Sequence, residues 1–148
     1  IKTLTNWSYL MKISEVEQFL TELESFIPSK FIDYSHDLKT RAACERYFEK
    51  IIEAVVDLSF LLIREIGAML PEDEKGSFDS LKNEGIISEK LCNKLKDAKG
   101  MSNIIAHNYG SVDDEIVFNS LNEELITDVS DFLDQISKRK EIKKNLKK

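Results

Sequence analysis

This 148-residue chain has few residues that break or cross-link a backbone, with only 5 glycines, 2 prolines and 2 cysteines. So few breakers disfavour a sheet-rich fold with many turns and favour long helices. Cys44 and Cys92 stand in helical patterns without a CxxC partner, which is typical of reduced thiols. No apolar run approaches the roughly 20 residues that cross a membrane, and no secretory signal is recognisable. We therefore expect a cytoplasmic protein with no membrane partner.

Charge is present in quantity but unevenly placed. The net charge is −6, yet residues 138–148 hold seven Lys or Arg and one Glu, so this tail carries +6 and the other 137 residues carry −12. Such an acidic body is a poor general binder of nucleic acid. The basic tail is either a solvated helix end or a source of added phosphate affinity.

We expect the chain to consist of three segments. Residues 1–13 are an N-terminal extension, either native or added, because Met11 begins a plausible native start. Residues 14–137 form one helical domain, since 148 residues suit a single compact core. Residues 138–148 are the basic C-terminal tail.

Apolar residues recur every three or four positions, which predicts helices. Ser14 and Glu17 form an S-x-x-E capping box, so the first helix is expected from Ser14 to about Ile27, before Pro28. A second helix is expected over about 37–70. It would be roughly 50 Å long, longer than a small domain, so we expect it to bend or break.

The second half of the chain continues this pattern. A loop is expected over 71–77, a short helix over 78–85 that Gly85 closes, and a helix that Ser88 caps and Gly110 stops near residue 109. Asp113 or Asp114 caps the last helix. These elements predict an all-α fold, an antiparallel up-and-down bundle of four to five helices.

One stretch stands out chemically: "MSNIIAHNYGSVDDEIV", residues 101–117. It holds His107, and Lys99, Asn103 and His107 share one helix face at i, i+4 and i+8. The only other histidine, His36, has no motif around it and is expected at the surface or in a cap. Arg41 and Arg46 either meet a cleft or pair with neighbouring acids such as Glu45 and Glu49.

Together, "RAACERYFEKIIEAVVDLSFLL", "SFDSLKNEGIISEKLCNKLKDAKGM" and "SNIIAHNYGSVDDEIV" resemble the HEPN superfamily, and within it the HepT-type ribonuclease toxins. That family's signature is an arginine, four to six intervening residues, then a histidine, often followed by x-Tyr. Here the end of the signature is present as His107-Asn108-Tyr109, and Asn103 stands where an asparagine usually follows the arginine.

The arginine itself is absent. Ser102 occupies its position at the shortest spacing, and no arginine lies between Arg64 and Arg139. Arginine suits that place because its charged fork binds phosphate in a bidentate manner, whereas serine offers one neutral donor. Five positions along a helix turn residue 102 about 140° away from His107.

The resemblance implies a toxin that cuts RNA without metal or cofactor. His107 would be the acid/base, Asn103 would orient its ring, and Tyr109 would accept AMP from a minimal nucleotidyltransferase antitoxin. It also implies a homodimer whose two His107 residues face one groove. The missing arginine leaves a second reading open: a degenerate HEPN protein that binds the nucleotidyltransferase but cuts nothing.

Overall fold

The computed structural model describes the backbone of residues 2–107 and 112–146, and the side chains of residues 7–107 and 112–138. The described residues form helices and contain no strand. In chain order the elements are α1 (Lys2–Phe26), α2 (Phe31–Ser35), α3 (Leu38–Ile66), α4 (Glu74–Asn83), α5 (Glu89–His107), α6 (Asp114–Asn119), the π-helical segment η1 (Ser120–Leu125) and α7 (Ile126–Leu146).

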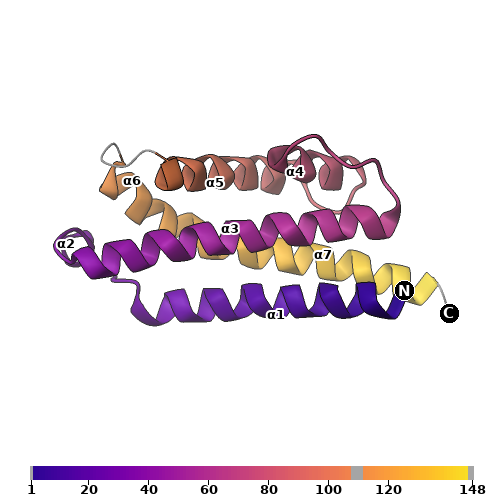
Figure 1. Cartoon of the computed structure of the whole chain (residues 1–148), viewed down its shortest axis with the longest axis horizontal. Coiled ribbons are helices and arrows are strands. Elements are labelled where there is room, and N and C mark those ends of the chain that lie inside the picture. Colours follow the sequence, from indigo (N-terminus) through magenta and orange to yellow (C-terminus); the bar gives the residue numbers. More distant parts are fainter. Residues whose placement is uncertain (1, 108–111, 147–148) are drawn as a thin grey trace.

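The four long helices α1, α3, α5 and α7 alternate in direction (Figure 1). This confirms the predicted antiparallel up-and-down bundle. Helices α2 and α6 lie together at the end of the bundle where α5 finishes, and α4 covers the opposite end of α5 (Figure 1). No helix in the described part of the chain is long and apolar enough to cross a bilayer.

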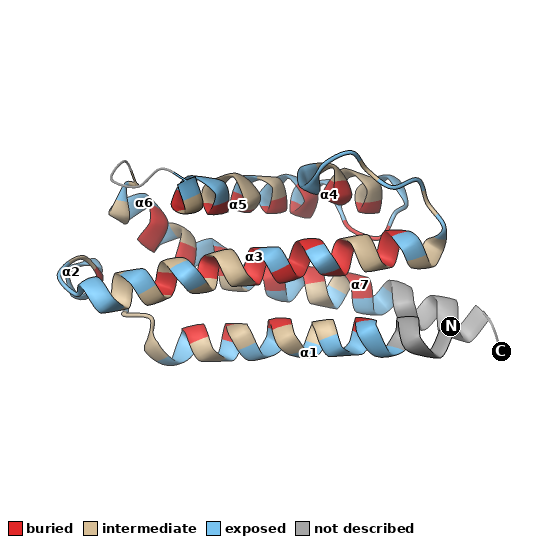
Figure 2. Ribbon diagram, in the orientation of Figure 1, coloured by how far each residue is buried: buried red, intermediate tan, exposed pale blue. Residues whose placement is uncertain are grey.

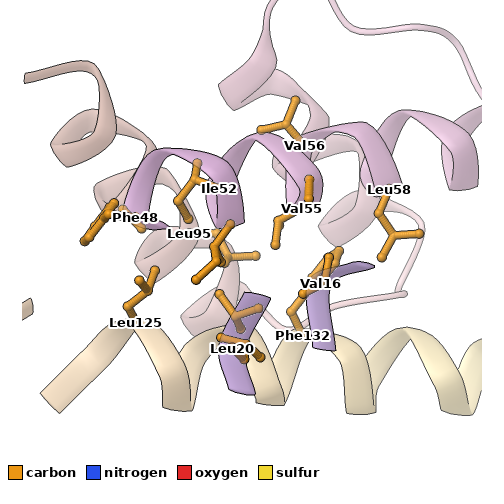
Figure 3. Packing of buried hydrophobic residues seen from close by; sticks show 14 of the residues in the cluster. Val16, Leu20, Phe48, Ile52, Val55, Val56, Leu58, Leu95, Leu125 and Phe132 are labelled. Carbon is orange, nitrogen blue, oxygen red and sulfur yellow. The ribbon is translucent and has the colours of Figure 1, made fainter. Parts of the chain in front are cut away.

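The core is centred on α3, which contacts α1, α4 and α5 and has buried residues from Cys44 to Ile63, next to exposed ones on its other face (Figure 2). Figure 3 shows Phe48, Ile52 and Val55 of α3 directed into the space between the other helices. Their partners there are Val16 and Leu20 of α1, Leu95 of α5, Leu125 of η1 and Phe132 of α7. Burial of such side chains contributes about 1.5–3 kcal/mol each, and this packing holds the bundle together.

Capping side chains begin four of the helices, α3, α4, α5 and α6. Asp37 Oδ1 accepts from the Thr40 N–H at 3.2 Å and begins α3, as predicted. We expected this helix to bend or break; α3 runs without a break to Ile66, so of the two alternatives the break is wrong. It ends four residues earlier than expected because Gly67 adopts a left-handed φ of 71°, and the Ala68 N–H donates to the Ile63 carbonyl.

Two predicted caps are confirmed on the second half of the chain. Ser88 Oγ accepts from the Leu91 N–H at 3.1 Å at the start of α5. Asp113 accepts from the N–H groups of Glu115 and Ile116 at 3.0 and 3.3 Å at the start of α6. The predicted stop at Gly110 lies outside the described residues.

The expected start of the first helix at Ser14 is wrong. Helix α1 already begins at Lys2, so Ser14 lies in mid-helix, where backbone N–H groups find partners within the helix and need no cap. Tyr9 is 2% exposed and belongs to the common core. That residues 1–13 are an extension and residues 138–148 a basic tail stays a prediction. Helix α7 continues to Leu146.

The predicted loop at 71–77 is also wrong in part, because α4 begins at Glu74. Asp73 caps it by accepting from the Gly76 N–H at 2.6 Å. A side chain at position 76 would place its Cβ 2.8 Å from Asp73 Oδ1, so the glycine permits the close approach of the cap. Gly85, with φ 73°, follows the end of α4 as predicted.

Two elements were not predicted. Helix α2 has only five residues, which is too short for a helical period of apolar residues to be recognised in the sequence. The π-helical η1 interrupts what the sequence pattern indicates as one last helix.

Replacing the Asp113 cap with alanine should lower the free energy of unfolding by about 1 kcal/mol, because two backbone donors lose their acceptor. Ser14→Ala, by contrast, should leave it unchanged or slightly raised, since alanine is the better residue inside a helix. Urea denaturation of both variants measures the difference. A loss at Ser14 equal to that at Asp113 would contradict the continuous α1.

Candidate functional site

The predicted row of polar residues on α5 is present. His107 is the last residue of α5 and is exposed, and Asn103 is exposed one turn earlier. Another turn back, Lys99 Nζ lies 3.0 Å from Asn103 Oδ1 and 2.7 Å from Glu74 Oε2. Lys99 is therefore held by two oxygens and links α5 to the first turn of α4.

The contacts of Asn103 run toward Lys99 and not toward the histidine. Among the described residues no hydrogen bond joins Asn103 to His107, so its role in orienting the imidazole stays a prediction. Tyr109, two residues further along, lies outside the described residues.

Ser102 faces the interior. It is 5% exposed, and its Oγ donates to the Lys99 carbonyl at 2.9 Å. The hydroxyl is thus satisfied within its own helix, on the side away from the exposed His107. Within one protomer, this residue does not supply the phosphate contact that the family arginine would make.

A pocket of about 380 Å³ lies beside the end of α5. Its lining comes from the first turns of α3, from α5 and from the start of α6: Leu38, Arg41, Ala42, Glu45, Ile105, Val112 and Asp114. Ile105 precedes His107 by two positions, and Val112 follows the 108–111 segment directly. The segment that begins at His107 therefore connects two walls of this pocket.

Arg41 joins three elements at the pocket. Its Nη1 donates to the Ser35 carbonyl at the end of α2, and its Nε lies 3.8 Å from Asp114 Oδ2 on α6. Arg46, in contrast, points to solvent and pairs with Glu49 of its own helix at 3.7 Å. Both arginines that the sequence left open line a pocket and pair with an acid, but only the pocket of Arg41 lies beside the end of α5; that of Arg46 lies between α1 and α3.

The pKa values of two groups near Arg41 are raised. Burial, and then the charge of Asp114, raise the pKa of the Glu45 carboxyl. Burial, and then the charge of Glu45, raise the pKa of the Tyr34 phenol, whose hydroxyl is buried and has no hydrogen-bond partner. Glu45 and Asp114 were missed as site residues, because the sequence showed them only as a helix pairing partner and a cap.

The other chemically active side chains are placed as structural groups. Cys44 and Cys92 are buried and free, and burial raises the pKa of Cys44 to about 11. His36 is exposed at the end of α2. The described residues contain no group of three or more His, Cys, Asp or Glu that would hold a metal ion.

Comparison with known proteins gives the family. The family model described as "Ribonuclease HepT-like" matches residues 16–136. The chain belongs to the HepT-like ribonuclease family. An Archaeoglobus fulgidus protein named "Putative RNase" is 30% identical over 129 residues, which cover 81% of this chain and 96% of that protein. The Shewanella oneidensis "mRNA nuclease HepT" is 27% identical over 88 residues, 60% of this chain and 65% of that protein.

Solved structures share the fold of this HepT-like chain. The tri-AMPylated HEPN toxin of Shewanella oneidensis, solved in complex with an MNT antitoxin, superposes with a TM-score of 0.81 at 20% identity, covering 87% of this chain and 96% of that one. YutE of Bacillus subtilis, a cytosolic protein of unknown function, superposes with a TM-score of 0.78 at 18% identity, covering 93% and 92%. At these identities the likeness shows the fold, an all-α HEPN bundle.

Removing the charge of Glu45 should stabilise the HepT-like fold. An acid whose pKa is raised on folding costs stability while it is ionised, so Glu45→Gln should raise the free energy of unfolding at pH 7. The gain should shrink as the pH falls through the raised pKa of the Glu45 carboxyl, which then takes up its proton, and should be gone below the ordinary pKa of a glutamate. Glu49→Gln, one turn along α3 and outside the pocket, is the matched control. Equal stability of wild type and Glu45→Gln at pH 7 would contradict this electrostatic assignment.

Proposed function

We propose that this protein is the toxin subunit of a toxin–antitoxin pair and that it cuts RNA in the cytoplasm without a metal ion. The observation that carries this proposal is the exposed His107 at the end of α5, inside the segment matched to the HepT-like ribonuclease family. Its named relatives include a "Putative RNase" and an "mRNA nuclease HepT".

In this proposal His107 is the acid/base of the reaction. The imidazole removes the proton of a ribose 2′-hydroxyl or donates one to the leaving 5′-oxygen, and an exposed ring is accessible to an RNA strand. No metal or cofactor has a role in these steps.

Charge that develops on the phosphate needs a cation, and Ser102 is not one. Lys99 shares the face of His107 but lies roughly 12 Å along the helix axis, where Glu74 and Asn103 hold its ammonium group. Lys99 thus suits a neighbouring phosphate better than the scissile one. We propose that a second copy of the chain completes the site, in a homodimer whose two His107 side chains face a shared groove.

RNA cleavage by the purified protein in EDTA tests the catalytic assignment. His107→Ala should lower the rate about 10²–10⁴-fold, the usual contribution of a general acid/base. The matched control is His36→Ala, which replaces the other exposed histidine and should cut like wild type. Equal rates for wild type and His107→Ala would contradict the proposal.

A second function is favoured by the burial of Ser102. With its hydroxyl turned inward, the chain is a degenerate HEPN protein that binds a nucleotidyltransferase and does not cut RNA. In that case wild type is silent and an arginine restores cleavage. Both Ser102→Arg and Met101→Arg are needed, because position 102 is buried and an arginine there strains the core, whereas position 101 is half-buried.

We further propose that a minimal nucleotidyltransferase antitoxin silences the protein by transferring AMP to Tyr109. Support comes from the Shewanella oneidensis HEPN toxin, which is tri-AMPylated in its complex with an MNT antitoxin. Phosphate charge two residues from His107 repels RNA.

Incubation with a minimal nucleotidyltransferase and ATP should add AMP to wild type, and mass spectrometry of the intact protein detects it. Tyr109→Phe should abolish the addition, because phenylalanine offers no hydroxyl. Tyr47→Phe, a half-buried tyrosine on α3, should be modified like wild type. Full modification of Tyr109→Phe would show that another residue accepts AMP.

A further inference from the structure

We propose that the pocket formed by Arg41, Glu45 and Asp114 binds a guanine base, and so makes the protein prefer guanosine beside the bond that it cuts. This inference rests on the proposed ribonuclease function for its substrate. A free guanine nucleotide presents the same base, so the pocket itself is testable without cleavage.

The charges of the pocket exclude a phosphate as its occupant. It carries one guanidinium and two carboxylates, and Asp114 lies against Arg41 at 3.8 Å. No ion pair involves Glu45 among the described residues, so the lining has an excess of negative charge. A neutral ligand with hydrogen-bond donors fits these groups, because a carboxylate only accepts.

Guanine matches both kinds of group. Its N1–H and N2–H₂ are neighbouring donors on one edge, which a carboxylate such as Glu45 accepts side by side. Its O6 and N7 are neighbouring acceptors, the pair that a guanidinium such as that of Arg41 binds most often. Adenine, cytosine and uracil each lack two neighbouring donors on the Watson–Crick edge, so the same carboxylate faces an acceptor in each of them.

The remaining walls fit a flat ring. Leu38 and Ala42 are one turn apart on α3, and Ile105 and Val112 line the pocket with them. Apolar walls with a few convergent polar groups are usual for small-ligand sites, and about 380 Å³ lies within their range of sizes.

The Tyr34 side chain lies near these charged groups but does not line the pocket. Its pKa is raised by burial and by the charges of Glu45 and Asp114. The groups available to a base in the pocket are therefore those of Arg41, Glu45 and Asp114.

The position of the pocket couples base recognition to cleavage. Ile105 and Val112, two of its walls, flank the segment that starts at His107. Ile105 precedes His107 by two positions on α5, so a base held in the pocket lies beside the helix turn that carries His107. Base choice is then made next to the histidine and away from the Lys99 end of α5.

Calorimetric titration of the full-length protein with 5′-GMP, 5′-IMP and 5′-AMP tests the pocket. IMP differs from GMP only by the missing 2-amino group. We expect GMP to bind about 5- to 100-fold more tightly than IMP, the discrimination typical of a good base contact, and AMP to bind more weakly still. Glu45→Gln should abolish the preference for GMP, and Glu49→Gln should keep it.

RNA oligonucleotides that differ only by G, inosine or A at one position then give the cleavage preference. Cutting beside G assigns the pocket to RNA, whereas GMP-selective binding without a preference in cutting assigns it to a free guanine nucleotide. If the protein cuts no RNA but binds GMP through Glu45, the proposed function fails and the pocket stands. Equal binding of GMP, IMP and AMP, or a GMP preference that survives in Glu45→Gln, overturns the inference.

Discussion

Everything in this molecule depends on the burial of α3 between its neighbours. Phe48, Ile52 and Val55 have no exposed surface, and their contacts with α1, α5, η1 and α7 hold the long helices in one bundle. Because α3 and α5 run in opposite directions, the start of one lies beside the end of the other. The hydrophobic core thereby brings Arg41 and Glu45 to the segment that carries His107.

The sequence predicted what is local. Apolar spacing identified the long helices, and Ser88 and Asp113 were recognised as caps because their partners lie two or three residues away. The predictions failed where tertiary contacts decide. Ser14 resembles a cap, but residues before it, such as Tyr9, enter the core and extend the helix through it. Gly76 resembled a loop residue, although its missing side chain admits the Asp73 cap.

The candidate site likewise has one part that local spacing predicted and one part that it did not. The row of Lys99, Asn103 and His107 follows from helical spacing alone, whereas the contact of Asn103 with Lys99 was seen only in the structure. The pocket does not follow from any spacing. Glu45 and Asp114 are far apart in sequence, and each has an ordinary local explanation. Glu45 and Asp114 lie together around Arg41 only because α6 is placed beside the first turns of α3 in the folded protein.

The π-helical η1 changes the rotational register between α6 and α7, which follow one another without a loop. A π turn holds about one more residue than an α turn, and one residue corresponds to about 100° of rotation. Helix α7 can therefore keep Val129 and Phe132 on the core while α6 directs Asp114 toward Arg41. The extra residue of η1 thus sets the rotation of α6 relative to the core face of α7. Because Val117 and Phe118 of α6 are buried as well, a change of this rotation would move both the pocket wall and that part of the core.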